Sequence, residues 1–135
     1  MQVQLQAVAP YAEQIAASPE GRRRATEFIT VTYEHIPGDL VAHEISGAAN
    51  CTAAMPLIDY AMREGYDLEA DRIDCPVRIV WGTEDKLLRY PSAAVRFRTD
   101  WLPTADWIEL DGVGHCPQLD VPLETAQLIL GFTTR

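Results

Sequence analysis

The sequence predicts an α/β chain in which a purely helical segment precedes parallel strands with flanking helices. Residues 77–81, Val-Arg-Ile-Val-Trp, form a β-branched and aromatic run that ends at Gly82, as expected of a buried strand. Residues 106–110 form a second strand-like run, and a helical pattern lies between the two. A connection of about two dozen residues is typical of a right-handed crossover between parallel strands. The second half of the chain should therefore contain a parallel sheet with helices packed on it.

The first half of the chain contains only helical patterns. Residues 18–35 have a Ser-Pro helix start and no breaker before the Pro-Gly pair at positions 37 and 38. A second helix is expected over residues 39–49, and a third over residues 52–65, ending at a glycine. We therefore assign residues 1–70 to a helical cap or lid segment and residues 71–135 to the α/β core portion.

Two helices are expected to cover the strands of the second half. One runs from Pro91 to about Trp101 with an apolar face, and the last is started by Asp120 and Pro122. The inward face of the last helix should carry Leu123, Ala126 and Leu130, and the three tryptophans should pack in the core. Only two strands are visible, which is fewer than a stable independent sheet normally requires.

Composition excludes several classes of partner and site. A net charge of −9 repels nucleic acid and anionic membrane surfaces. The three cysteines are an odd number without CxxC spacing, so neither a disulfide framework nor a zinc site is expected. The start of the chain lacks the features of a signal peptide, and no apolar run approaches the roughly 18 residues of a membrane span, which favours a cytoplasmic protein. The basic run at residues 22–24 is interpreted as a solvated helix face without function.

Two loops place an ionisable residue just beyond a predicted parallel strand. The first is Gly82-Thr83-Glu84-Asp85 and the second is Gly112-Val113-Gly114-His115. Open α/β sheets build their sites at the carboxyl edge of the strands, so Asp85 and His115 should meet if the strands are neighbours. A carboxylate on one imidazole nitrogen fixes the tautomer of a histidine that acts as a general base. Taken alone, each residue is equally well explained as part of an ordinary turn or loop.

Together these two loops resemble those of a known family. Residues 75–85, Cys-Pro-Val-Arg-Ile-Val-Trp-Gly-Thr-Glu-Asp, resemble the strand and acid loop of the α/β-hydrolases, and residues 112–117, Gly-Val-Gly-His-Cys-Pro, resemble their histidine loop. The resemblance implies the C-terminal portion of an α/β-hydrolase fold over residues 73–133, with Asp85 as the acid and His115 as the base of a catalytic triad. Glu84 is a weaker candidate for the acid because it lies one place short of the usual position.

The nucleophile of such a triad is missing from the sequence. The family places a serine on a Gly-x-Ser-x-Gly elbow before the acid, and no such motif occurs here. The three serines have helical settings: Ser18, Ser46 and Ser92. Cys116 is disfavoured as a substitute because adjacent residues usually point in different directions. The helices of the first half resemble the variable cap of these enzymes, where Tyr33, Tyr60, Met55 and Met62 either line an apolar substrate pocket or pack in the core.

The leading hypothesis is a truncated or separately encoded hydrolase fragment that is inactive by itself. A nucleophile-bearing segment from elsewhere would complete it for serine-type hydrolysis of an ester or related carbonyl compound, with no cofactor and no metal. A rival hypothesis is a non-catalytic module that self-associates or binds a partner, because exposed sheet edges need a covering chain. Either hypothesis predicts a homo-oligomer or a complementing chain. A third keeps the fold but changes the chemistry, which depends on the type of nucleophile.

Overall fold

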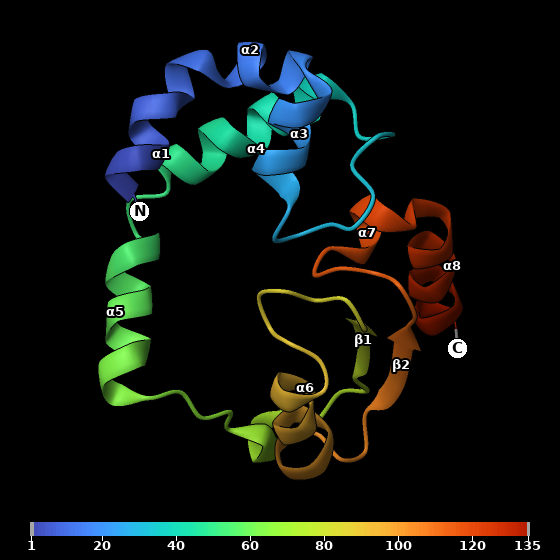
Figure 1. Cartoon of the computed structure of the whole chain (residues 1–135). Helices are drawn as coiled ribbons and strands as arrows, with labels where there is room; N and C mark the ends of the chain where they lie inside the picture. The colour runs from blue at the N-terminus through green and yellow to red at the C-terminus, as the bar shows by residue number, and fades with distance from the viewer. Residues whose placement is uncertain (1, 135) are drawn as a thin grey trace. The chain divides into compact units, whose positions relative to one another are not determined.

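A computed structural model describes residues 2–134, which divide into two compact units (Figure 1). The first unit comprises residues 2–26 and Glu34–Asp67, and the second comprises Glu27–Tyr33 together with residues 68–134. The short segment Glu27–Tyr33, which we name the strap, thus belongs to the second unit although it lies within the helical half of the sequence. The assignment of residues 1–70 and 71–135 to a cap and a core stays a prediction.

The first unit is built from helices around a small core. Helix α4 packs against α1 and α2, and its buried Val41 and Ile45 lie among alanines that permit close approach of the helices. The predicted helices over residues 39–49 and 52–65 are confirmed, and Gly65 ends the second of these with a φ of 76°. The elements are α1 (Gln2–Val8), the 3-10 turn η1 (Ala9–Tyr11), α2 (Ala12–Ala17), α3 (Pro19–Thr26), α4 (Gly38–Asn50) and α5 (Ala54–Glu64).

The helix predicted to continue to residue 35 ends at Thr26 instead. Residues 29–32, Ile-Thr-Val-Thr, are all β-branched, and this type of side chain lowers helix propensity. The backbone N–H groups of Val31 and Thr32 donate to the carboxylate of Asp120, so the segment satisfies its polar groups outside a helix. A tertiary contact therefore favours a non-helical segment here, although the sequence contains no local helix breaker.

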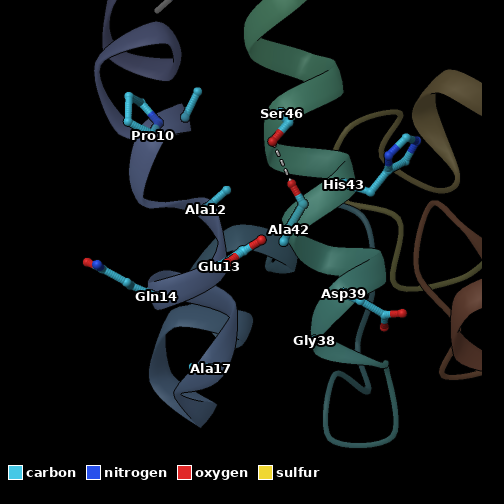
Figure 2. A pocket seen from close by; sticks show the side chains of 11 residues that line it. Pro10, Ala12, Glu13, Gln14, Ala17, Gly38, Asp39, Ala42, His43 and Ser46 are labelled. Carbon is cyan, nitrogen blue, oxygen red and sulfur yellow. Dashed lines mark hydrogen bonds between the residues drawn. The ribbon is translucent and has the colours of Figure 1, made fainter.

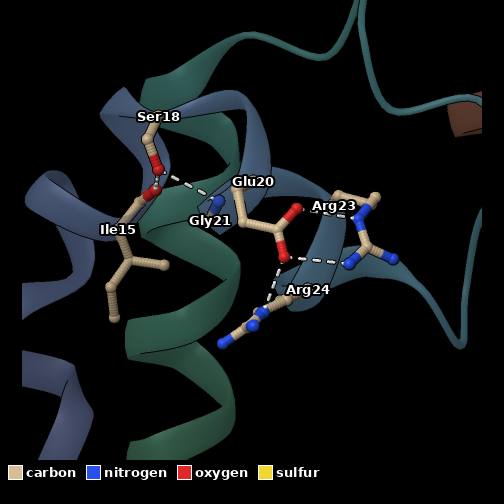
Figure 3. Close-up of polar contacts among 6 residues, drawn as sticks. All are labelled: Ile15, Ser18, Glu20, Gly21, Arg23 and Arg24. Carbon is tan, nitrogen blue, oxygen red and sulfur yellow. Dashed lines mark hydrogen bonds and ion pairs between the residues drawn. The ribbon is translucent and has the colours of Figure 1, made fainter.

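The basic run on α3 is only partly the solvated face that the sequence predicts, and Figure 3 shows its exposed members Arg23 and Arg24 beside Glu20. Arg23 and Arg24 both pair with Glu20, and these hydrogen bonds, with that of Arg23 the stronger, lower the pKa of Glu20 to about 2. Arg22 differs, because its guanidinium is partly buried and donates to the carbonyl oxygen of Ala16 at 2.9 Å. One of the three arginines thus caps the end of α2 rather than facing solvent.

The second unit contains two strands that pair in parallel (Figure 1). The register runs from Arg78 opposite Asp106 to Gly82 opposite Leu110, so the two strands end side by side. Both strand predictions are confirmed. The elements are the 3-10 turn η2 (Ala70–Arg72), β1 (Arg78–Gly82), α6 (Ser92–Arg96), the π-helical turn η3 (Phe97–Trp101), β2 (Asp106–Leu110), α7 (Pro117–Asp120) and α8 (Pro122–Thr133).

Different chemistry covers the two faces of this small sheet. On one face Trp81 stacks on Trp107 and contacts Phe97 of η3, with ring centroids 5.7 and 5.5 Å apart. On the other face Arg78 forms an ion pair with Asp106 and lies over the ring of Phe132 in α8 at 5.0 Å. Arg78 also donates to the carbonyl oxygen of Leu128, so it links α8 to the strands.

The predicted fold class, the C-terminal portion of an α/β-hydrolase fold, is wrong for this chain. The described residues are mainly helical and contain one sheet of only two parallel strands, whereas an α/β-hydrolase has a multi-stranded parallel sheet. The reason lies in the sequence, because two strand-forming runs cannot supply such a sheet and the first 70 residues carry helical patterns alone. Across the described residues, none of the helices combines the length and the apolar character needed to cross a membrane.

The predicted inward face of α8 is also wrong. Leu123 is 80% exposed and Leu130 is 61% exposed, and Ala126 is exposed as well. The helical period of apolar residues is present, but the two-stranded sheet is too narrow to cover it. A periodic pattern predicts which side of a helix is apolar and does not supply the surface that buries it.

Gly82 is the glycine of the second unit at which an added side chain would make the closest contacts. A Cβ atom at this position would lie 2.2 Å from the carbonyl oxygen of Val113 and 2.3 Å from that of Gly114. Because both atoms belong to the backbone, we expect Gly82→Ala to destabilise the protein by about 1–3 kcal/mol in chemical denaturation.

The matched control for this prediction is Gly131→Ala. Gly131 lies in α8, and no neighbouring atom of the described residues comes within 4 Å of the position that its Cβ atom would take. Alanine should therefore be neutral or stabilising there by about 0.5–1 kcal/mol. Equal free energies of unfolding for the two variants would contradict the close approach at Gly82.

Candidate functional site

The parallel pairing brings Asp85 and His115 together at one edge of the sheet. Asp85 ends the turn that follows β1, and His115 lies in the loop that follows β2. The Oδ2 atom of Asp85 lies 2.8 Å from the Nδ1 atom of His115, which is hydrogen-bonding distance. The two residues singled out from the sequence are therefore in direct contact.

The Asp85 carboxylate is held by the backbone of its own turn. Asp85 is only 7% exposed, and its Oδ1 atom accepts hydrogen bonds from the N–H groups of Leu87 and Leu88 at 2.9 and 2.8 Å. One carboxylate oxygen is thus engaged locally, and the other is directed at the imidazole. A buried carboxylate fixed in this way orients a histidine ring more strictly than a mobile surface carboxylate.

The His115 side chain has one engaged and one open nitrogen. Nδ1 contacts Asp85, and within the second unit Nε2 makes no hydrogen bond to a described residue. The side chain is 32% exposed, against 5% for that of Asp85. When Nδ1 carries the proton that it donates to Asp85, the lone pair of Nε2 is available to accept another proton.

The two loops are locked together by backbone contacts. The N–H of Thr83 donates to the carbonyl oxygen of Leu110 at 3.0 Å, and the N–H of Glu84 donates to that of Val113 at 2.9 Å. The Thr83 hydroxyl accepts from the N–H of Gly112 at 2.9 Å, and Gly112 has a φ of 68°, which favours glycine. The loops therefore form one rigid edge.

The other candidates from the sequence occupy less suitable places. Glu84 is exposed on the turn beside Asp85, whose side chain is the one that reaches His115. The Ser46 hydroxyl donates to the carbonyl oxygen of Ala42 inside α4, and the Ser92 hydroxyl donates to that of Arg89. Ser18 lies between α2 and α3, so none of the three serines directly follows a strand.

Asp120 is the residue of this site that the sequence analysis missed. It was interpreted as the start of the last helix, but its carboxylate makes no capping bond there and is buried instead. Its Oδ2 atom accepts from the N–H of Gly114 at 2.7 Å. Its Oδ1 atom accepts from the hydroxyl of Thr30, from the N–H groups of Val31 and Thr32 at 2.8 Å each, and from the hydroxyl of Thr32 at 2.9 Å.

The charge state of Asp120 follows from two opposing effects. Burial is the larger single effect and raises the pKa of the carboxyl group, because it disfavours the ionised form. Hydrogen bonds from Thr30, Thr32 and Gly114 favour the ionised form, and together they outweigh burial. The pKa of Asp120 therefore lies below its ordinary value of 3.8.

A separate hollow of about 690 Å³ lies in the first unit, between α2 and α4 (Figure 2). Small side chains line much of it, and Glu13 extends from α2 toward α4. Neither Asp85 nor His115 is among the residues that line this hollow. Among the described residues, no group of three histidine, cysteine or acidic side chains is placed to hold a metal ion.

Comparison with known proteins gives one structural likeness. No family model matches the chain, and no curated protein matches it by sequence. A solved structure of a membrane phospholipase A, described as a novel bacterial virulence factor, matches 90% of this chain with a TM-score of 0.57 and 23% sequence identity. At this identity the likeness shows a shared fold alone. The chain spans 40% of the length of that protein, so the likeness concerns only a part of it.

The depressed pKa of Asp120 makes a prediction about acid stability. A carboxyl group whose folded-state pKa lies below its unfolded value stabilises the fold above the unfolded value, and this contribution is lost as the pH falls through the folded value. We expect the wild-type protein to be more stable than Asp120→Asn at neutral pH, with a difference that shrinks below about pH 3.8. Thermal unfolding of both proteins across the acid range measures this difference.

Glu20 also has a lowered pKa, but it is present in both proteins and its effect cancels in the difference. A gap between the two melting temperatures that stays constant from neutral pH to pH 2 would contradict the assignment.

Proposed function

We propose that this chain carries the acid and the base of a hydrolytic catalytic triad, with Asp85 orienting His115. The observation that carries the proposal is the 2.8 Å contact between the buried carboxylate and Nδ1, with Nε2 left open. In this arrangement the carboxylate holds the neutral ring in the Nδ1–H tautomer, and Nε2 takes a proton from a hydroxyl nucleophile. The carboxylate then stabilises the imidazolium that forms.

Two further lines support a hydrolase. The acid and histidine loops resemble those of the α/β-hydrolases in residue type and order, and the structural likeness is to part of a protein named as a phospholipase A. Both favour an ester or related carbonyl compound as substrate. The bond is broken by acyl transfer, in which the nucleophile adds to the carbonyl carbon and His115 returns its proton to the leaving oxygen.

The proposed site needs a nucleophile that this sequence does not contain. No Gly-x-Ser-x-Gly motif is present, and none of the three serines directly follows a strand. The nucleophile and the amides that would hold the oxyanion must therefore come from a segment outside this sequence. This requirement makes the chain one half of a site that a second segment completes.

A second candidate function is a non-catalytic module that associates with itself or with a partner. The observation that favours it is the apolar surface of the second unit, where Leu123, Ile129 and Leu130 of α8 are all more than half exposed. Such surfaces mark contact sites or aggregation hazards. The two candidates differ in whether replacing His115 lowers the activity of a site that a second segment has completed.

Without a nucleophile, the purified chain should not turn over esters. We expect hydrolysis of a p-nitrophenyl ester by the wild-type chain to be no faster than hydrolysis by His115→Ala. The comparison needs only a spectrophotometer and matched protein concentrations. Robust turnover that His115→Ala abolishes would show that a nucleophile is present after all.

A chimera provides the positive test. This chain would replace the aligned part of the solved phospholipase A, whose remaining length then supplies the rest of the enzyme. We expect ester hydrolysis that falls roughly 10²–10⁴-fold in both His115→Ala and Asp85→Asn, because each removes part of the proton-transfer pair. The exposed neighbour Glu84 offers a matched control, and Glu84→Gln should leave kcat nearly unchanged. A folded, active chimera that is indifferent to His115→Ala would refute the catalytic proposal.

A further inference from the structure

The Asp120 carboxylate takes no part in the proposed proton transfer, yet it is among the most heavily bonded groups of the second unit. It accepts five hydrogen bonds, four on Oδ1 and one on Oδ2. The donors to Oδ1 all belong to the strap, which lies 88 to 90 positions away in the sequence. Because its donors come from both the strap and the histidine loop, this carboxylate links two segments that are distant in the sequence.

The two oxygens of Asp120 restrain the two residues that flank His115 in the sequence. Oδ2 accepts from the N–H of Gly114, the residue just before the histidine. The residue just after it, Cys116, donates its N–H to the carbonyl oxygen of Ile29 in the strap at 2.8 Å. Oδ2 of Asp120 therefore holds Gly114 directly. Because Oδ1 binds the strap, the same carboxylate also holds Cys116 indirectly, through the strap.

The space around this contact is tight. A Cβ atom at Gly114 would lie 3.0 Å from Oδ2 of Asp120 and 3.1 Å from the Cα atom of Thr30. The loop therefore has little room to move while the carboxylate is in place. The imidazole needs such restraint, because its 32% exposed side chain makes a single hydrogen bond to the described residues, the one to Asp85.

We infer that Asp120 is a positioning residue, which holds the loop of His115 so that Nδ1 stays directed at Asp85. The inference rests on the proposed function, since it assigns Asp120 the task of keeping the base of that site oriented. It acts on the histidine through the backbone, and among the described residues it makes no hydrogen bond to the imidazole.

The variant Asp120→Asn tests this selectively. The amide retains one oxygen, which is expected at the Oδ1 position where four donors converge, and its NH₂ group then faces the N–H of Gly114. Two donors cannot bond to each other, so the flank at Gly114 is released while the strap stays bound. The matched control is Asp111→Asn, a change of the same kind at an exposed carboxylate that accepts a hydrogen bond from the hydroxyl of Thr83.

The measurement is the neutral tautomer of His115, observed by ¹⁵N NMR of the imidazole in the full chain. We expect Nδ1–H in the wild type and in Asp111→Asn, and a shift of most of the population to Nε2–H in both Asp120→Asn and Asp85→Asn. The Nδ1 proton should also exchange faster with solvent in Asp120→Asn. A loss of global stability alone does not change the tautomer of the molecules that remain folded.

The outcomes separate the inference from the proposed function. Wild-type His115 in the Nε2–H form overturns both. An Nδ1–H tautomer that is lost in Asp85→Asn but kept in folded Asp120→Asn overturns the positioning role and leaves the proposed function intact.

If Asp120→Asn does not fold, Gly114→Ala provides the second variant, because its added methyl group displaces the Asp120 carboxylate by a few tenths of an ångström. The expected result is again a partial shift to Nε2–H, and an unchanged tautomer overturns the inference.

Discussion

The parallel pairing of β1 with β2 is the interaction on which the second unit depends. It places the ends of both strands at one edge, and it allows the two loops to exchange backbone hydrogen bonds over Gly82, where a side chain would collide with the facing carbonyl groups. The contact between Asp85 and His115 follows from this geometry. With only two strands, however, the sheet leaves apolar helix surface uncovered. Most of the other described elements are helices.

Two buried carboxylates, those of Asp85 and Asp120, bind the loops at this edge of the sheet. Asp85 is bound by backbone N–H groups of its own turn, so its placement is local. Asp120 is bound by groups from the strap and from the histidine loop, so its placement depends on segments that are distant in sequence. Under the proposed function, such a site would couple the orientation of the proposed base, His115, to the packing of a remote segment.

The difference between local and distant determinants also explains what could be predicted from the sequence. The strands, the helix over residues 39–49 and the pair formed by positions 85 and 115 are encoded by short patterns, and all were predicted. The strap and the role of Asp120 depend on contacts across about 90 residues, which no local pattern contains. The burial of α8 was mispredicted for a related reason, since amphipathic spacing does not reveal how many strands are present to cover a helix.

The orientation of the His115 ring tests the central claim most directly. In the isolated wild-type chain, the imidazole nitrogens of the neutral residue report which of them carries the proton, and the account predicts Nδ1, with the proton shared toward Asp85. Free imidazole side chains in water favour the other tautomer. A wild-type spectrum in which Nε2 carries the proton and Asp85→Asn causes no change would contradict the account.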